Sequence, residues 1–320
     1  MITDREMMLR AVELARGGFP APNPRVGCVI VRDGAVVGEG YHDHHGGPHA
    51  EVVALGAAKE RARSGTAYVT LEPCAHYGRT PPCTDALIQA GMAKVVYAVQ
   101  DPNPKAAGGA AVLQGQGIVV EHLTTPEAEE VNRIFLHAQH TGRPYVIAKL
   151  AMTLDGYIAR PDGTSKWITG EEARAEGHRL RAEMGAVLVG ASTAAIDRPQ
   201  LTARIPGVLN QPARYVLDPQ GRVKDFPGET LRETQIEALL QDLRSRGHIG
   251  LLVEGGAKTV AGFLEADLVD EIWAFQSPDL FGDGITAWPP RKKSGQQSNF
   301  LLHEVRRVGR DALTIWRKLP

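Results

Sequence analysis

Three short stretches of this 320-residue chain decide its interpretation: His49-Ala50-Glu51, Pro73-Cys74 and Pro81-Pro82-Cys83. One imidazole and two thiolates make a three-ligand zinc set. Three protein ligands with a fourth position free are typical of catalytic zinc rather than structural zinc. Zinc in such a site lowers the pKa of water and so supplies a nucleophile at neutral pH. Glu51 lies two residues after His49, and we expect its carboxyl to move protons between that water and a leaving amine.

A structural zinc is the main alternative, but it would need a fourth protein ligand. Cys28 is the only spare thiol in the chain. It lies inside the apolar run of residues 26–31, so we expect a buried strand residue there. His44 and His45 belong to a polar turn, and we expect them to be solvated rather than ligating.

The zinc stretches resemble the cytidine and deoxycytidylate deaminase superfamily, whose signature is H-x-E followed by P-C-x-x-C. Here the residues between Cys74 and Cys83 are 75–82, a longer insert that resembles the riboflavin-pathway deaminases. Residues 22–29, 38–42 and 100–104 agree with that subfamily. The resemblance implies a three-layer α/β/α domain. It also implies that the substrate is contacted by Asn23, His42, His76 and Arg79. For His42, His76 and Arg79 the alternative is that they only cap the loop.

The second half resembles the reductase half of the bifunctional riboflavin-pathway enzyme, which has a dihydrofolate-reductase-like α/β fold. The stretches that carry this resemblance are residues 149–156, 165–169, 189–193, 197–204 and 253–259. By the family's pattern, the NADPH site would be lined by Ala151, Trp167, Thr193, Asp197, Gly256, Ala257, Lys258, Thr259, Val260, Ala261 and Gly262. The same pattern would give substrate contacts to Ser165, Arg181, Leu201, Arg204 and Glu254.

Physical reasoning alone supports these assignments only in part. A strand ending at Gly255-Gly256 before a helix can cradle phosphate with free backbone N–H groups, but plain turn chemistry is the alternative. It is not the G-x-G-x-x-G fingerprint, so no Rossmann domain is predicted. Arg181 shares a polar helix face with Arg174 and His178, so a solvated side chain is its alternative. Residues 223–249 are short for the family, and residues 225–230 are the only candidate there for a further cofactor-side strand.

Hydrophobic periodicity predicts alternating strands and helices in both halves. Strands are expected at 26–31, 36–38, 67–71, 94–99, 118–121, 145–151, 186–190, 213–217, 249–254, 271–275, 301–307 and 312–317. Helices are expected at 4–17, 51–63, 85–90, 106–115, 126–140, 171–183, 233–245 and 257–265. Residues 141–144 form a seam between a helix and a strand, which predicts domains at 1–143 and 144–320.

Composition restricts the partners of the chain. Net charge is −1, which argues against a nucleic-acid or anionic-membrane binder. No run of 18 apolar residues occurs, and the first residues lack an export signal, so we expect a cytoplasmic protein. The expected partners are a small phosphorylated pyrimidine, Zn²⁺ and NADPH, and we expect a homo-oligomer.

Together these features predict a bifunctional deaminase–reductase of riboflavin synthesis. One alternative is a nucleoside or tRNA deaminase fused to an unrelated cofactor module. The other is a zinc-stapled binding protein that catalyses neither reaction. Metal analysis combined with an NADPH-consumption assay distinguishes the three.

Overall fold

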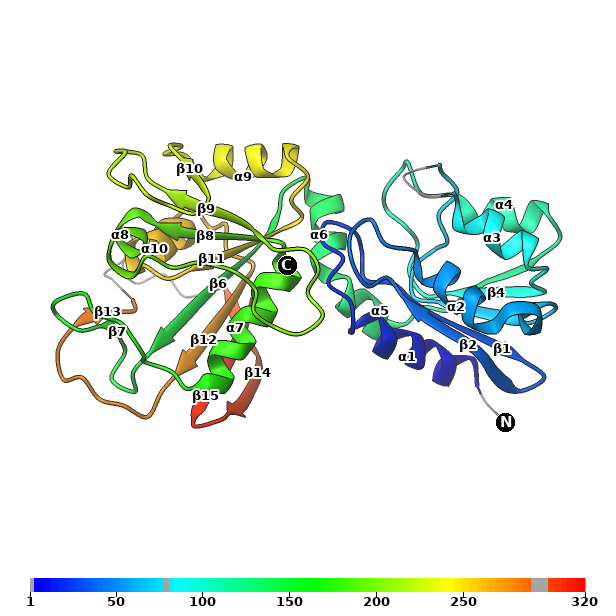
Figure 1. The fold of residues 1–320 in the computed structure, drawn as a ribbon, viewed down its shortest axis with the longest axis horizontal. Coiled ribbons are helices and arrows are strands. Elements are labelled where there is room, and N and C mark those ends of the chain that lie inside the picture. Colours follow the sequence, from blue (N-terminus) through cyan, green and yellow to red (C-terminus); the bar gives the residue numbers. More distant parts are fainter. Residues whose placement is uncertain (1–2, 78–80, 289–298, 320) are drawn as a thin grey trace. The chain divides into compact units, whose positions relative to one another are not determined.

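The computed structural model describes residues 3–77, 81–288 and 299–319. The chain divides into two compact units, Met1–Thr141 and Gly142–Pro320. Each has its own sheet and its own helices (Figure 1).

The first unit is built on a five-stranded sheet in the order β2-β1-β3-β4-β5. Its strands are β1 (Gly27–Arg32), β2 (Ala35–Tyr41), β3 (Thr66–Val69), β4 (Lys94–Tyr97) and β5 (Val119–His122). β1 is antiparallel to β2 and β3, whereas β3, β4 and β5 are parallel. Its helices are α1 (Asp4–Ala15), α2 (Ala50–Ala58), α3 (Cys83–Gln89), α4 (Gly109–Gly115), α5 (Pro126–Val131) and α6 (Arg133–Thr141).

Alternation along β1 directs neighbouring residues to opposite helices. A Cβ on Gly27 would meet the Ala11 carbonyl of α1, so α1 packs directly on that face. The next residue, Cys28, pairs with Gly40 of β2 and belongs to a buried cluster with Ala50 of α2. Since successive side chains of a strand point to opposite faces, α1 and α2 cover the two sides of the sheet. The predicted three-layer architecture is therefore confirmed.

The single helix expected at 126–140 is in fact two helices, so that prediction was wrong. α5 ends at Val131 and α6 begins at Arg133. Between them Asn132 has φ −106° and ψ 10°, and its side chain is only 2% exposed. Its amide forms two hydrogen bonds with the backbone of Arg25, which a continuous helical periodicity does not reveal.

The second unit contains an eight-stranded sheet in the order β10-β9-β8-β11-β6-β12-β15-β14. Its strands are β6 (Tyr145–Met152), β8 (Ala186–Gly190), β9 (Ala213–Leu217), β10 (Glu229–Leu231), β11 (Gly250–Glu254), β12 (Glu271–Gln276), β14 (Phe300–Val308) and β15 (Asp311–Lys318). In this sheet the six neighbouring strands β10, β9, β8, β11, β6 and β12 are parallel. The β14–β15 hairpin continues the sheet, with β15 antiparallel to β12. Two short strands, β7 (Tyr157–Ala159) and β13 (Ile285–Thr286), pair separately.

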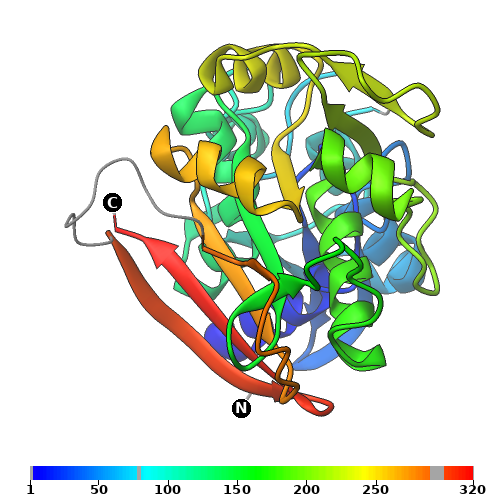
Figure 2. The same ribbon diagram turned by 90° about the vertical axis from the view of Figure 1, so that its left-hand side faces the viewer.

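Helices cover both faces of this sheet (Figure 2). They are α7 (Glu171–Met184), α8 (Ala191–Asp197), α9 (Ile236–Ser245) and α10 (Ala257–Glu265). Val253 of β11 packs in a buried cluster with α9 and α10 residues, including Leu240 and Phe263. The following residue, Glu254, points to the other face, which α7 covers. A Cβ on Gly177 of α7 would lie 3.8 Å from Glu254 Oε1. The sheet thus places a carboxylate beneath α7.

Two expectations for this unit change. Residues 225–230 were the only candidate for a strand in the short 223–249 segment, and a strand forms slightly later, at Glu229–Leu231. Residues 279–299 are rich in Gly, Pro, Lys and Ser, which predicts a surface loop. In the structure this range contains β13, and its residues 289–298 lie outside the described part. The predicted α/β class of both halves is confirmed. None of the helices in the described residues combines the length and apolar character needed to cross a membrane.

Candidate functional site

The three predicted metal ligands come together in the first unit. His49 is the N-cap of α2, Cys83 is the first residue of α3, and Cys74 lies in the loop after β3. His49 Nδ1 is 3.2 Å from Cys83 Sγ and 3.6 Å from Cys74 Sγ. The Cys83 backbone N–H donates to Cys74 Sγ at 3.4 Å. A helix start thus supplies one ligand and orients another.

The surroundings shift the pKa values of the Cys74 and Cys83 thiols in opposite directions. Hydrogen bonds from Cys83 and His49 lower the pKa of Cys74 to about 4. The hydrogen bond to Cys74, together with burial, raises the pKa of Cys83. The thiolate form, which is the form that binds a metal, is therefore favoured at Cys74.

The donor set fits zinc. The ligand atoms of His49, Cys74 and Cys83 all lie within 4.8 Å of one another. Among the described residues they form the one group of three or more His, Cys, Asp or Glu side chains that could hold a metal. Cys28 is fully buried in β1, as predicted, and is not part of this group. Among the described residues no fourth donor joins these three nitrogen and sulfur atoms, which matches the catalytic class of zinc site.

Glu51 lies in the first turn of α2 and is 3% exposed. Burial raises the pKa of its carboxyl, and the negative charge of Cys74 raises it further. A carboxyl group with a raised pKa beside a metal site is suited to exchange protons.

Asn23 and His42 border the metal ligands. His42 Nδ1 lies 2.9 Å from the Pro48 carbonyl oxygen and therefore carries the proton. Its Nε2 then accepts from the Asn23 amide at 3.0 Å. The His42 ring is edge-on to the His49 ring, with centroids 5.2 Å apart. Burial lowers the pKa of His42, so the neutral form is favoured.

The other two predicted substrate contacts of this half are placed less closely. His76 is exposed in the loop after Cys74. Arg79 lies outside the described residues. His44 and His45 are half-buried rather than fully solvated, and neither belongs to the metal-ligand group.

In the second unit, parallel strands β8 and β11 end side by side at glycine-rich turns. Gly255 and Gly256 have φ of 76° and 79°. A Cβ on Gly190 would lie 2.2 Å from Thr259 Oγ1, and one on Gly256 would lie 3.0 Å from Thr193 Oγ1. Predicted cofactor residues from two loops therefore meet at the start of α10, where backbone N–H groups favour an anion.

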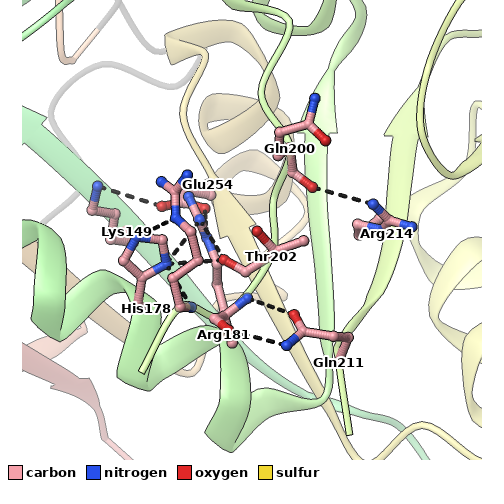
Figure 3. A network of polar contacts seen from close by, with 10 residues as sticks. Lys149, His178, Arg181, Gln200, Thr202, Gln211, Arg214 and Glu254 are labelled. Atoms are coloured by element: carbon pink, nitrogen blue, oxygen red, sulfur yellow. Dashed lines mark hydrogen bonds and ion pairs between the residues drawn. The ribbon is translucent and has the colours of Figure 1, made fainter. Parts of the chain in front are cut away.

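A network of charges lies beneath α7 (Figure 3). Arg181 Nε donates to Glu254 Oε2 at 2.7 Å, and Lys149 Nζ is 3.5 Å from Glu254 Oε1. Burial raises the pKa of Glu254, but the charges of Arg181 and Lys149 outweigh it and the pKa is lowered. The alternative of a solvated Arg181 is wrong, because its side chain is 15% exposed and is held by Glu254.

His178 connects this network to Arg204. Its Nδ1 donates to the Thr202 carbonyl oxygen at 2.9 Å and lies 3.3 Å from Arg181 Nη1, and its Nε2 accepts from Arg204 Nε at 3.3 Å. Arg181 Nη1 donates to the Thr202 carbonyl oxygen at 3.0 Å. Leu201, in the same loop, is buried and has φ 53°. The two arginines predicted to hold substrate are thus linked through one imidazole.

The remaining predicted residues lie around these contacts. Ser165 Oγ donates to Asp197 Oδ1 at 3.1 Å, and Trp167 is 68% exposed beneath the Arg174 guanidinium. Val260 is buried in the sheet core, and a Cβ on Gly262 would face Ile236, so only their backbones could reach a ligand. The other positions comprise one exposed side chain, Lys258, and the partly or fully buried Ala151, Ala257 and Ala261.

Sequence reasoning gave no role to several residues that order these sites. The Glu72 carboxylate accepts from the backbone N–H groups of Asp101, Gly108 and Ala110, which holds the loop around Cys74. Lys149 interrupts the otherwise apolar run of β6, which is a signal of a role, whereas Glu72 follows β3 and has no such signal. His178 lies on the helix face that the sequence predicts to be solvated, but its ring contacts Thr202 and Arg204.

Comparison with known proteins places both units in described families. Residues 1–99 match the cytidine and deoxycytidylate deaminase zinc-binding region. Residues 144–314 match the RibD C-terminal domain. The chain is therefore a zinc-dependent deaminase domain joined to a RibD-type reductase domain.

Relatives extend this match over nearly the whole chain. The riboflavin biosynthesis protein RibD of Escherichia coli is 42% identical, and the alignment covers 96% of this chain and 97% of that protein. A solved structure of Acinetobacter baumannii RibD is 39% identical, with a TM-score of 0.91 over 99% of both chains. A Thermotoga maritima diaminohydroxyphosphoribosylaminopyrimidine deaminase/5-amino-6-(5-phosphoribosylamino)uracil reductase is 35% identical, with a TM-score of 0.89 over 99% of both. The chain belongs to the RibD family of bifunctional deaminase–reductases of riboflavin biosynthesis, which use zinc and NADPH.

Proposed function

We propose that residues 1–143 deaminate 2,5-diamino-6-(5-phosphoribosylamino)pyrimidin-4(3H)-one and that residues 144–320 then reduce the ribosyl side chain. Water replaces the C2 amino group, which leaves as ammonia. Hydride addition at C1′ of the opened imine form, with one proton, gives 5-amino-6-(5-phosphoribitylamino)uracil. The observation that carries this proposal is the convergence of His49, Cys74 and Cys83 within 4.8 Å.

In the deaminase unit, His49, Cys74 and Cys83 would hold zinc, which supplies a nucleophile at neutral pH by lowering the pKa of water. Glu51 takes up the proton of that water and delivers it to the departing amine. Asn23 and His42 orient the pyrimidine, with His76 and Arg79 as further contacts from the 75–82 insert. Burial of Glu51 supports its role, because it raises the carboxyl pKa toward the working range.

In the reductase unit, NADPH supplies the hydride when bound. The turn at Gly256–Thr259 and Thr193 would hold its phosphates, with Trp167, Asp197 and Ala151 along the rest of the cofactor. Arg181 and Arg204 would bind the substrate phosphate, and Ser165 and Leu201 would border the substrate. Glu254 orients Arg181, as their 2.7 Å contact supports.

The proposed function is tested by measuring ammonia release and NADPH consumption separately, because deamination should precede reduction. Without NADPH, the protein should release one ammonia per diaminopyrimidine and accumulate the deaminated ribosylamino compound. NADPH should then be consumed in equal amount. NADPH consumption that proceeds without prior ammonia release would contradict the proposed order, and release from cytidine at a similar rate would contradict the substrate.

We also propose that the protein is a cytoplasmic homo-oligomer. Its β14 is the edge strand of the eight-stranded sheet, and Leu301, Leu302 and Val305 on it are 50–60% exposed. Exposed apolar edge strands favour pairing with another chain. Light scattering should give a mass above that of one chain, and Val305→Lys should lower it.

A further inference from the structure

We propose that two side-chain amides outside the active sites, Asn132 and Gln211, position one site loop in each unit. Each amide pairs with both the N–H and the C=O of a single loop residue, as a neighbouring strand would. The inference rests on the proposed function and adds a positioning residue to each reaction.

Asn132 holds the loop that carries Asn23. The Arg25 N–H donates to Asn132 Oδ1 at 2.9 Å, and Asn132 Nδ2 donates to the Arg25 carbonyl oxygen at 2.9 Å. Asn132 is 2% exposed, so these bonds are shielded from water. Since both backbone groups of Arg25 are fixed by one planar amide, the direction of the preceding chain is fixed as well.

Three further contacts lead from Arg25 to the metal ligands. Asn23, two residues before Arg25, donates to His42 at 3.0 Å. His42 in turn is tied to the Pro48 carbonyl oxygen and lies edge-on to His49. With its N–H on His42, Asn23 presents Oδ1 as an acceptor for an amino or ring N–H group of the pyrimidine. Asn132 therefore acts on substrate through Asn23.

Gln211 does the same for the reductase loop. The Ala203 N–H donates to Gln211 Oε1 at 2.9 Å, and Gln211 Nε2 donates to the Ala203 carbonyl oxygen at 3.1 Å (Figure 3). Ala203 lies between Thr202, whose carbonyl oxygen accepts from Arg181, and Arg204, whose Nε donates to His178 Nε2. Gln211 thus fixes the loop between the two arginines proposed to hold phosphate.

The two variants Asn132→Ala and Gln211→Ala are controls for each other, because each removes a bidentate amide from one unit of the full-length protein. Two net hydrogen bonds correspond to roughly a 5- to 150-fold effect. Asn132→Ala should raise the KM for deamination by at least about tenfold. Its zinc content, its deamination kcat and its reduction of pre-deaminated substrate should stay within twofold. Gln211→Ala should raise the KM for pre-deaminated substrate and leave the KM for NADPH and deamination unchanged.

Double variants separate positioning from general loss of structure. In an Asn23→Ala background, Asn132→Ala should add less than a twofold change, because its effect passes through Asn23. In an Arg204→Ala background, Gln211→Ala should likewise add little. If the losses multiply instead, or if either single variant leaves its own KM within twofold, the proposal is overturned.

A folding defect is checked separately. Asn132→Ser keeps a hydroxyl oxygen that can accept from the Arg25 N–H, loses the amide donor and buries no charge, so it replaces Asn132→Ala if that variant does not fold and should show a raised KM with full zinc content. Gln211 is exposed, so Gln211→Ala is expected to fold in any case. Loss of both deamination and reduction together in a zinc-loaded Asn132 variant would overturn the positioning role. Absence of both reactions in the unaltered protein would instead overturn the proposed function.

Discussion

Two buried carboxylates, Glu51 and Glu254, show how surroundings set the chemistry of one functional group. Burial and the nearby Cys74 raise the pKa of Glu51. Glu254 is equally enclosed, but Arg181 and Lys149 hold its pKa below the ordinary value. A carboxyl with a raised pKa can exchange protons, whereas one with a lowered pKa stays charged and orients cations.

Glu51→Gln tests the proton-transfer role. The amide keeps the shape of the side chain but cannot exchange a proton, so deamination should fall by roughly 10²–10⁴-fold. Zinc content and reduction of pre-deaminated substrate should be unchanged, as measured by metal analysis and NADPH consumption. Deamination that stays within tenfold of the unaltered protein would exclude Glu51 as the shuttle.

Arg181→Ala and Arg204→Ala test the proposed phosphate site. A charge-assisted contact is worth roughly 1.5–3 kcal/mol, or on the order of 10- to 150-fold in reductase kcat/KM. A dephosphorylated substrate should react slowly with the unaltered protein, and the variants should add little further loss with it. The control is Arg179→Ala, because Arg179 is an exposed residue of α7, the helix that also carries Arg181. Near-normal rates of both variants with both substrates would show that the phosphate binds elsewhere.

Individual metal ligands could be predicted because the pattern of one histidine and two cysteines, each beside a fixed neighbour, has few other roles. The positioning residues could not. Asn132 pairs with backbone 107 residues away, and Gln211 pairs with backbone eight residues away. A backbone partner leaves no side-chain pattern in the sequence.

At the scale of secondary-structure elements, most strands and helices form close to the predicted ranges, because their apolar periodicity is strong. The break between α5 and α6 was missed, since residues 126–140 show helical periodicity throughout. Tertiary pairing of Asn132 with Arg25 overrides that local preference. The short β10 was also hard to foresee, because three residues are too few for a periodic signal.

His248 links two elements in a pH-dependent way. It precedes β11 and contacts the hydroxyl of Tyr215 on β9 at 2.8 Å. Burial, and then the charge of Arg246, lower the pKa of His248. The unfolded chain therefore takes up this proton at a higher pH than the folded protein. Stability from the neutral imidazole is present above the unfolded pKa near 6.5 and is lost as pH falls toward the folded pKa.

His248→Gln should flatten this dependence. The free energy of unfolding from urea titrations should fall less between pH 7.5 and pH 5.5 in the variant. The difference in slope should be at most about 1.4 kcal/mol per pH unit, the value for one proton. His303→Gln, exposed on β14, is the control and should follow the unaltered protein. Parallel profiles for His248→Gln and the unaltered protein would contradict the argument.

At the scale of the whole molecule, each unit has its own sheet and its own buried core. All the contacts described for the zinc site lie within Met1–Thr141, and those of the charged network lie within Gly142–Pro320. The class of each half followed from its motifs together with the alternation of strands and helices.

Residues 1–143 expressed alone should therefore fold, bind zinc and release ammonia from the diaminopyrimidine. The measurements are circular dichroism, metal analysis and ammonia release at matched concentrations. A folded, zinc-loaded fragment that releases no ammonia would show that the second unit completes the first site.

The central claim is that one chain carries a zinc-dependent deaminase and an independent reductase. Cys83→Ser tests it most directly when zinc content, ammonia release and reduction of pre-deaminated substrate are measured on one preparation, with Cys28→Ala as the control. The account predicts loss of zinc and ammonia release in Cys83→Ser, with reduction retained, and all three retained in Cys28→Ala. Full zinc occupancy and normal ammonia release in Cys83→Ser would contradict it.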